Sequence, residues 1–215
     1  MNKAVIFDLD GTLIDSLPDI AEHVNITLEK FGEPKKGYDF IGTLTGDGAR
    51  NLISRSFDGK FSGAELDERL DYYNRIYTDS GSPKTRVFDG VGKMLIELKK
   101  RGYKLGILTN KPQMTTDVVY ERLLSQYGFD IVVGSRPGMK IKPDPTMLLQ
   151  MLKEIDVLPE NCYFVGDDKP DAQIAINAGV KGVSELWGYR SKDFLVEAGA
   201  KVFASTPKEL LQIIK

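Results

Sequence analysis

Two residue patterns alternate from Pro83 to the C-terminus, and this alternation constrains the fold more than any other feature of the chain. Short apolar runs that predict buried strands lie at residues 104–108, 131–134, 161–165, 182–186 and 201–204. Helical patterns lie at residues 93–101, 116–126, 145–155 and 171–177, and again from Pro207 onward. Strands that alternate with helices form right-handed βαβ units. We therefore predict an α/β fold, a doubly wound parallel sheet with helices on both faces.

An earlier apolar run is predicted to form the first strand of this sheet. It starts at Ala4 and ends abruptly at two carboxylates, Asp8 and Asp10, followed by Gly11. Two carboxylates at one strand end cost desolvation and mutual repulsion, which a bound cation relieves. Because an isolated Asp-x-Asp also occurs as a plain loop after a strand, its role depends on what else lies near it.

No strand pattern occurs between Ser16 and Pro83. Helices are predicted at residues 17–31, 49–57 and 63–80, with Ser16 as the N-cap of the first and a glycine-rich turn before the second. His23 has no histidine or cysteine neighbour at ligand spacing, so we expect a partly exposed helix residue and no metal ligand. The predicted organisation is a core domain at residues 1–15 and 86–215 with a helical domain inserted at residues 16–85.

Composition narrows the class of protein. The 215 residues are 41% apolar and 28% charged, which is ordinary for a globular protein, and the net charge is −2. The chain has no excess of basic residues that would attract a polyanion, so we expect neither nucleic acid nor a membrane as partner. The first residues lack a charged-then-apolar pattern and no apolar stretch approaches 18 residues, so we expect neither export nor a membrane span. The single cysteine, Cys162, excludes an internal disulfide. We expect a cytoplasmic protein, a monomer or weak homodimer.

Polar residues follow three of the predicted strands directly. They are Asp8 and Asp10, Thr109 and Asn110, and Asp167 and Asp168. Because the carboxyl ends of parallel strands meet at one edge of the sheet, where ligands bind, these side chains are expected to lie close together. Several carboxylates in one crevice call for a divalent cation, and oxygen donors favour Mg²⁺ over zinc.

A metal beside hydroxyl and ammonium groups is typical of a site for a phosphoryl group. The chain has no Gly-x-x-x-x-Gly-Lys-Ser/Thr loop, no complete dinucleotide fingerprint and no Gly-x-Ser-x-Gly elbow. With these motifs absent, the remaining way to handle a phosphoryl group is an aspartate nucleophile that forms an aspartyl-phosphate.

Four ordered motifs resemble those of the haloacid dehalogenase superfamily. They are Asp8-Leu9-Asp10-Gly11-Thr12-Leu13, Leu108-Thr109-Asn110, Lys142-Pro143-Asp144-Pro145, and Gly166-Asp167 with Asp171. The inserted segment resembles that superfamily's helical cap of the C1 type. Further stretches are similar to its phosphoglycolate phosphatase branch, namely Gly46-x-Gly48-x-x-x-Leu52-x-x-Arg55, Phe88-Asp89-Gly90-Val91, Lys111-Pro112 after the second motif, and Trp187-Gly188-Tyr189.

The resemblance implies a role for each motif residue. Asp8 would attack phosphorus, and Asp10 would protonate the leaving oxygen and then activate the hydrolytic water. Mg²⁺ would be held by Asp8, the Asp10 backbone carbonyl and Asp167. The phosphoryl group would be held by Thr109, the Asn110 backbone and Lys142, while Asp171 would orient that lysine or a metal-bound water.

Three questions about individual residues have more than one answer at this stage. Asp168 stands where the family commonly has Ser or Thr, so its part in metal binding is undecided. Lys140 competes with Lys142, although the following Pro-Asp-Pro favours Lys142. Arg50 and Arg55 in the inserted segment are candidate substrate contacts, and a solvated helix face explains them equally well.

The function expected from these residues is an Mg²⁺-dependent phosphatase acting on a small phosphorylated metabolite such as phosphoglycolate. A sugar-phosphate phosphatase, nucleotidase, pyrophosphatase or phosphomutase of the same superfamily is the enzymatic alternative. A phosphoacceptor signalling domain also uses aspartates, a threonine and a lysine at strand ends. Such a domain would be shorter and has no reason for a helical insertion of about 70 residues between its first two motifs.

Overall fold

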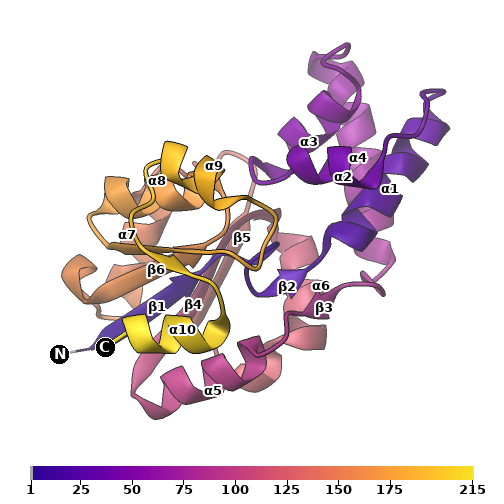
Figure 1. Cartoon of the computed structure of the whole chain (residues 1–215). Coiled ribbons are helices and arrows are strands. Elements are labelled where there is room, and N and C mark those ends of the chain that lie inside the picture. Colours follow the sequence, from indigo (N-terminus) through magenta and orange to yellow (C-terminus); the bar gives the residue numbers. More distant parts are fainter. Residues whose placement is uncertain (1) are drawn as a thin grey trace.

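A six-stranded parallel sheet forms the centre of the larger lobe of the molecule (Figure 1). The computed structural model describes residues 2–215. In spatial order the strands are β5 (Ile131–Ser135), β4 (Tyr103–Pro112), β1 (Lys3–Phe7), β6 (Cys162–Gly166), β7 (Lys181–Glu185) and β8 (Phe203–Ala204). Every neighbouring pair is parallel, and the chain passes from β1 first to β4 and later to β6 on the other side. The predicted doubly wound α/β fold is confirmed.

Helices cover both faces of the sheet (Figure 1). One face carries α7 (Thr146–Glu154) and α8 (Lys169–Ala178), and the other carries α5 (Val91–Lys100), α6 (Gln113–Leu123) and α10 (Pro207–Ile213). Successive β1 side chains point to opposite faces of the sheet. Ile6 packs under α7 and α8, whereas Val5 and Phe7 pack under α5, α6 and α10. Because both faces of β1 are buried, its sequence is a continuous apolar run without alternation.

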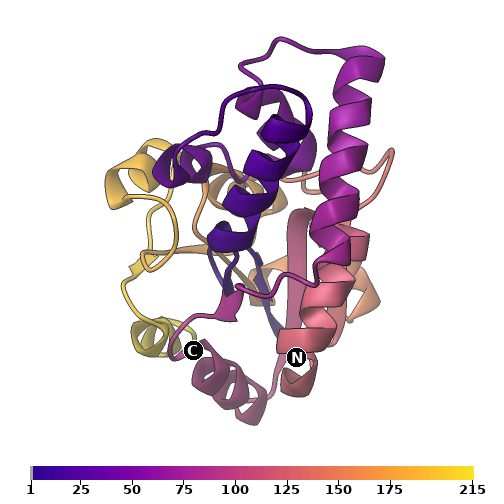
Figure 2. The same cartoon turned by 90° about the vertical axis from the view of Figure 1, so that its right-hand side faces the viewer.

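The smaller lobe, which we call the cap, consists of the four helices inserted after β1. They are α1 (Leu17–Lys30), α2 (Tyr38–Thr43), α3 (Gly48–Ser56) and α4 (Gly63–Asp79). Figure 2 shows α1 and the long α4 rising side by side from the sheet lobe. The cap has its own apolar core, which includes Leu28, Ile53 and Phe57. Helix α2 lies where the sequence predicts only a loop and turn, because six residues are too few to show a helical period.

Two chain segments join the cap to the sheet lobe, and they pair with each other. The short strands β2 (Ile14–Asp15) and β3 (Arg86–Val87) form an antiparallel ribbon at this junction. Asp19, in the first turn of α1, accepts hydrogen bonds from the backbone amides of Lys84 and Thr85 at 3.0 and 2.6 Å and from the Thr85 hydroxyl at 2.6 Å. One buried carboxylate therefore holds the returning segment against the start of α1.

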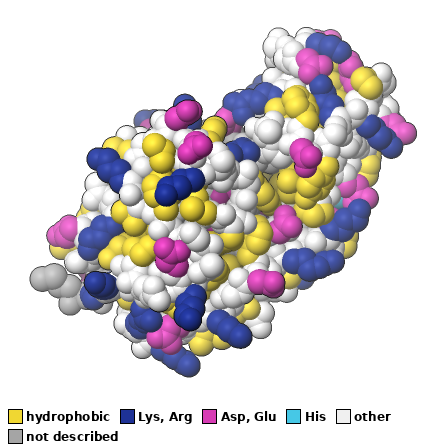
Figure 3. All heavy atoms as spheres, in the orientation of Figure 1, with side chains coloured by type: hydrophobic (Ala, Val, Ile, Leu, Met, Phe, Trp, Pro, Cys, Tyr) yellow, Lys and Arg dark blue, Asp and Glu magenta, His cyan; other side chains and the backbone are white. Residues whose placement is uncertain are grey.

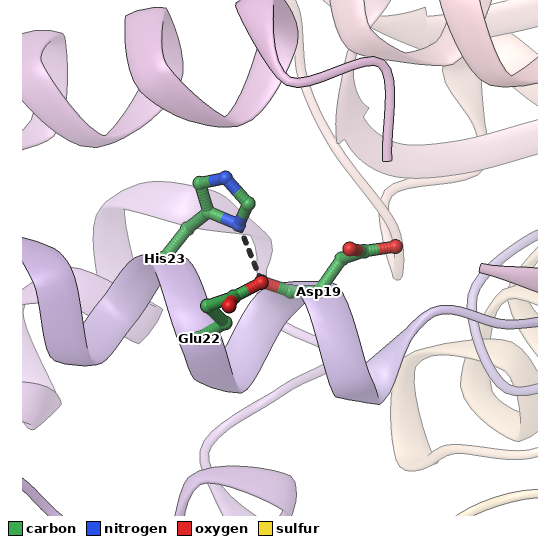
Figure 4. Close-up of side chains that lie close together, drawn as sticks. All are labelled: Asp19, Glu22 and His23. Atoms are coloured by element: carbon green, nitrogen blue, oxygen red, sulfur yellow. Dashed lines mark hydrogen bonds between the residues drawn. The ribbon is translucent and has the colours of Figure 1, made fainter. Parts of the chain in front are cut away.

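Asp19 lies beside Glu22 and His23 on α1, as Figure 4 shows. The His23 Nδ1 atom is 2.7 Å from the Asp19 carbonyl oxygen, and its ring packs 5.2 Å from the ring of Tyr77. His23 is buried, so the expectation of a partly exposed side chain is wrong: the helix face that carries it packs against α4. The Asp19 carboxylate points away from the imidazole toward the returning segment, so its contacts are accounted for by the junction.

Two further findings concern the outside of the molecule. No helix among residues 2–215 is long and apolar enough to cross a membrane. On the face seen in Figure 3, basic and acidic side chains are interspersed over both lobes without a patch of one sign. A short helix, α9 (Lys192–Glu197), was not predicted, for the same reason as α2.

Candidate active site

The carboxyl ends of β1, β4 and β6 open into a chamber roofed by the cap. Its volume is about 60 Å³. The sheet lobe contributes residues that follow the strands, among them Asp8, Asp10, Thr109, Asn110, Lys111, Asp168 and Asp171. The cap contributes mainly apolar side chains and glycine backbone, among them Ile20, Gly46, Gly48, Ala49, Leu52, Tyr73 and Tyr77. The polar residues predicted to gather at one sheet edge do so.

A buried lysine between two aspartates lies beneath this chamber. Lys142 Nζ donates to Asp8 Oδ1 at 2.6 Å and to Asp171 Oδ1 at 2.7 Å. Burial raises the pKa of the Asp8 carboxyl to about 7, although the Lys142 charge opposes this shift. Burial disfavours the lysine cation too, but Asp171 and Asp8 outweigh it and raise the pKa of Lys142 above its ordinary value. The rival Lys140 is exposed and pairs with Asp144 at 3.2 Å.

Asp167 lies at the end of β6 and is almost fully buried. Its carboxylate accepts hydrogen bonds from the Thr12 hydroxyl at 3.2 Å and the Tyr189 amide at 2.9 Å. Burial, followed by the charges of Asp171 and Asp8, raises the pKa of Asp167 well above its usual range. A group of carboxyls that repel one another in this way is stabilised by a cation.

The donor set fits a hard divalent ion. Asp8, Asp167 and Asp171 offer carboxylate oxygens that lie within 4.8 Å of one another. Both oxygens of Asp171 already accept hydrogen bonds, from Lys142 and from the Asp168 amide at 3.0 Å. Within residues 2–215, Asp167 accepts only from neutral donors, and Asp8 meets Lys142 through Oδ1 alone, so these two carboxylates are the better placed metal ligands. Asp171, which accepts from the Lys142 cation and from the start of α8, is better placed to hold the lysine.

Asp10 has partners that the sequence did not point to. Lys111 Nζ donates to both its carboxylate oxygens, at 3.0 and 3.1 Å, and to the Tyr77 hydroxyl of the cap at 3.0 Å. The Ser16 hydroxyl donates to Asp10 Oδ1 at 2.6 Å, so Ser16 occupies the predicted N-cap position of α1 without capping through its side chain. The position of Lys111 directly after Thr109 and Asn110 was the available signal for its role.

Thr109 and Asn110 lie on an extension of β4, which continues to Pro112 instead of ending at residue 108. Thr109 is buried and lines the chamber. The Asn110 side chain joins three segments: its Nδ2 donates to the carbonyls of Gly46 and Lys142 at 3.0 and 3.2 Å, and its Oδ1 accepts from the Lys142 amide at 2.9 Å. Asn110 thereby braces the loop that carries Lys142.

The two candidate arginines of the cap lie outside the chamber. Arg50 forms an ion pair with Asp67, and Arg55 pairs with Asp47 at 2.5 Å. Their side chains are 51% and 45% exposed, and neither lines the chamber. The structure therefore does not bring these two residues to the other site residues.

Asp168 takes part in helix capping and an ion pair. Its Oδ1 accepts from the Lys169 amide at 2.6 Å, and together with Asp171 it forms a capping box at the start of α8. Its Oδ2 is 2.8 Å from the guanidinium of Arg190. Both carboxylate oxygens of Asp168 are thus engaged by the protein.

A further buried carboxyl, that of Glu185 at the end of β7, lies beside this site. Its Oε2 accepts from the amides of Trp187 and Gly188 at 2.7 and 3.1 Å, whereas its Oε1 has no partner among the described residues. Burial, reinforced by the Asp167 charge, raises the pKa of Glu185 to about 10. Sequence analysis missed Glu185 because it falls inside the predicted strand at residues 182–186.

Comparison with known proteins agrees with this geometry. The model of the haloacid dehalogenase-like hydrolase family matches residues 5–184. The chain is 33% identical to phosphoglycolate phosphatase 1 of Pseudomonas aeruginosa, over 97% of this chain and 78% of that protein. It is 32% identical to a phosphoglycolate phosphatase of Colwellia psychrerythraea, over 99% of this chain and 97% of that protein. The chain therefore belongs to the haloacid dehalogenase-like hydrolase family.

Solved structures show the same similarity over the whole chain. A predicted phosphoglycolate phosphatase from Lactobacillus delbrueckii subsp. bulgaricus superimposes with a TM-score of 0.91 at 28% identity, covering 100% of this chain and 99% of that one. A predicted phosphoglycolate phosphatase from Haemophilus somnus gives 0.90 at 26% identity, covering 100% and 98%. The resemblance to this phosphatase branch of the family, inferred from the sequence motifs, is confirmed.

Proposed function

We propose that this protein hydrolyses a small phosphate monoester through an aspartyl-phosphate, with phosphoglycolate as the first candidate substrate. The main support is the meeting of Asp8 with Lys142 and Asp167 beneath a small chamber roofed by the cap. A carboxylate nucleophile beside a cation-binding cluster and an ammonium group suits phosphoryl transfer. The names of the relatives support phosphoglycolate among the small phosphate esters.

In the first step, an Asp8 carboxylate oxygen attacks phosphorus and the bond from phosphorus to the ester oxygen breaks. The leaving oxygen takes a proton from Asp10, which lies at the chamber wall and is held in place by Lys111 and Ser16. Water then attacks the phosphorus of the aspartyl-phosphate while Asp10 accepts its proton. Inorganic phosphate leaves, and the Asp8 carboxylate is restored.

The remaining site residues hold and neutralise the phosphoryl group in this proposal. Thr109, the Asn110 backbone amide and Lys142 would donate to its oxygens, and Asp171 keeps Lys142 directed toward Asp8. Mg²⁺ held by Asp8, Asp167 and the Asp10 carbonyl would supply further positive charge against the phosphoryl oxygens.

Chamber size and lining favour a short, anionic leaving group. The space beneath the cap is small, about 60 Å³. Of the described residues that line the chamber, Lys111 is the only basic one, since Lys142 lies beneath it. A two-carbon leaving group with a carboxylate, such as glycolate, suits the limited space, and Lys111, which also pairs with Asp10, is the basic side chain on the chamber wall that could receive its carboxylate.

The test is a panel of phosphate esters assayed with Mg²⁺ and compared by kcat/KM. We expect phosphoglycolate to exceed hexose phosphates and nucleotides by about 100-fold or more, because these larger esters do not fit beneath the cap. If a hexose phosphate or a nucleotide is the best substrate, the proposed substrate is wrong while the core chemistry stands. If no ester is hydrolysed, the whole proposal fails.

A further inference from the structure

One side chain of the sheet lobe, that of Arg190, extends to the cap and hydrogen-bonds to its backbone. Arg190 donates from Nη1 to the Gly42 carbonyl at 2.8 Å and from Nη2 to the Thr45 carbonyl at 2.8 Å. The Arg190 side chain is only 9% exposed, and it pairs with Asp168 at 2.8 Å. A guanidinium that meets two carbonyls and a carboxylate at once is held in a fixed orientation.

Arg190 contacts residues 42–46, which are the end of α2 and the start of the turn before α3 and form part of the chamber wall. Gly46 has φ +104°, and a Cβ atom there would lie 2.2 Å from Asp168 Oδ2. Its backbone therefore packs directly on the Asp168 carboxylate, which only glycine permits. The Gly46 carbonyl also accepts from Asn110 Nδ2 at 3.0 Å.

The segment that carries Arg190 also touches the metal-binding carboxylate and the cap junction. The Tyr189 amide donates to Asp167 Oδ2 at 2.9 Å. The Tyr189 hydroxyl accepts from the amides of Ser16 and Leu17, at the start of α1, at 2.9 and 3.0 Å. Consecutive residues thus contact the floor of the chamber, the junction and the roof.

We propose that Arg190, anchored by Asp168, is a positioning residue that holds residues 42–46 against the chamber and thereby limits the size of substrate that reacts. This role also accounts for the aspartate at position 168, where the family commonly has Ser or Thr, because the carboxylate binds Arg190. The proposal rests on the proposed function, because cap closure matters to a reaction inside the chamber.

The first test uses substrates that differ in size. In Arg190→Ala, kcat/KM for phosphoglycolate should fall about 10- to 100-fold, the effect of losing charged hydrogen bonds. For p-nitrophenyl phosphate, which is bulkier and has a leaving group that needs no proton, the fall should be less than about threefold. Arg190→Lys keeps the charge beside Asp168 but loses the two-carbonyl contact, so its loss should be intermediate.

The second test needs no substrate and therefore separates this proposal from the proposed function. Amide hydrogen exchange in residues 43–48 should quicken about tenfold or more in Arg190→Ala, while exchange in β1 and β4 stays as in wild type. The control is Arg101→Ala, because Arg101 also donates to a backbone carbonyl, that of Leu211 at 2.6 Å, far from the chamber.

Three results would overturn the proposal: unchanged exchange in residues 43–48, equal losses on both substrates, or a full match between the effects of Arg190→Ala and Arg101→Ala. If wild type ignores phosphoglycolate, the proposed substrate fails, and the exchange measurement still decides the role of Arg190. If Arg190→Ala does not fold, Arg190→Lys is subjected to both tests with the same expected direction of change.

Discussion

At the scale of single residues, the basic side chain placed to meet a substrate is Lys111, which lines the chamber beside Asp10, whereas the arginines of the cap lie outside it. Arg55 in particular is paired with Asp47. In Lys111→Met we expect the ratio of kcat/KM for phosphoglycolate to that for ethyl phosphate to fall by about tenfold, since only the first ester carries a carboxylate. Arg55→Ala, the matched control, should leave this ratio within about twofold of wild type.

Lys111 also contacts Asp10, so its removal should slow both esters to some extent. The ratio isolates the interaction with the carboxylate from this shared loss. If Lys111→Met slows both esters equally, Lys111 acts only through Asp10, and recognition of the carboxylate lies elsewhere.

Glu185 makes a prediction about stability and pH. Its pKa is raised to about 10 in the folded protein, against an ordinary value of 4.5, chiefly by burial. Between these values the folded chain keeps a proton that the unfolded chain releases, so this group lowers stability as pH rises through that window. Glu185→Gln removes the titration. In metal-free buffer, the Tm of Glu185→Gln relative to wild type should therefore increase from about pH 5 to about pH 8, by at least about 3 °C.

Equal Tm differences at both pH values would show that Glu185 titrates normally in the folded protein. The Tm of Glu185→Gln must be compared with that of wild type at each pH, because Asp8 and Asp167 also have raised pKa values and change the stability of both proteins alike.

At the scale of the elements, one carboxylate at the junction holds the segment that returns from the cap against the start of α1. Asp19→Ala removes the acceptor of two backbone amides and a hydroxyl, all buried or half-buried, so the free energy of unfolding should fall by about 3 kcal/mol. Glu22→Ala is the control on the same helix, because its pair with Lys84 is exposed and should contribute less than about 0.5 kcal/mol. Chemical denaturation of both variants measures the difference. Similar losses for the two would contradict the assignment to Asp19.

The elements themselves were largely predictable from the sequence. Apolar runs of four or five residues with polar ends located the strands of the sheet from β1 to β7, and the helices longer than about eight residues showed their period. The short helices α2 and α9 and the ribbon of β2 and β3 were not predicted, because two to six residues carry no periodic signal.

The site was predictable where chemistry follows a strand end and unpredictable where contacts are long-range. Asp8 and Asp167 directly follow strand ends and Lys142 lies in a motif on the loop after β5, and they meet in the structure. Arg190 contacts residues of the cap more than 100 positions away, and nothing in its local sequence shows this. Lys111 directly follows Thr109 and Asn110, which places it near the site but does not identify Asp10 and Tyr77 as its partners. Arg55 is the reverse case: the sequence offers it as a candidate substrate contact, and in the structure it lies outside the chamber, paired with Asp47.

At the scale of the whole molecule, metal binding should change stability as well as activity. EDTA should abolish hydrolysis, and Mg²⁺ should restore it. Mg²⁺ should also raise the Tm of wild type, because an ion that binds only the folded chain stabilises it. Asp167→Asn should lose this response, and without metal it should be more stable than wild type, since it removes one of the repelling carboxylates. Full activity in metal-free buffer would contradict the proposed cofactor.

We propose that the two lobes, a core at residues 1–15 and 86–215 and a cap at residues 16–85, are separate domains that can move relative to each other. The contacts of Arg190 and Asn110 with residues 42–46 describe the cap closed on the sheet lobe. Hydrogen exchange that protects the two lobes to different extents would support separate units.

The most direct test of the account is to look for phosphate on Asp8. Wild type is mixed with Mg²⁺ and excess p-nitrophenyl phosphate, quenched in acid within the first turnover, and digested for mass spectrometry. We predict a phosphoryl group on the peptide that contains Asp8, and neither phosphopeptide nor turnover in Asp8→Asn, whose circular dichroism should match that of wild type. A folded Asp8→Asn variant that still hydrolyses the ester, or a phosphoryl group found on another residue, would contradict the assignment of Asp8 as the nucleophile.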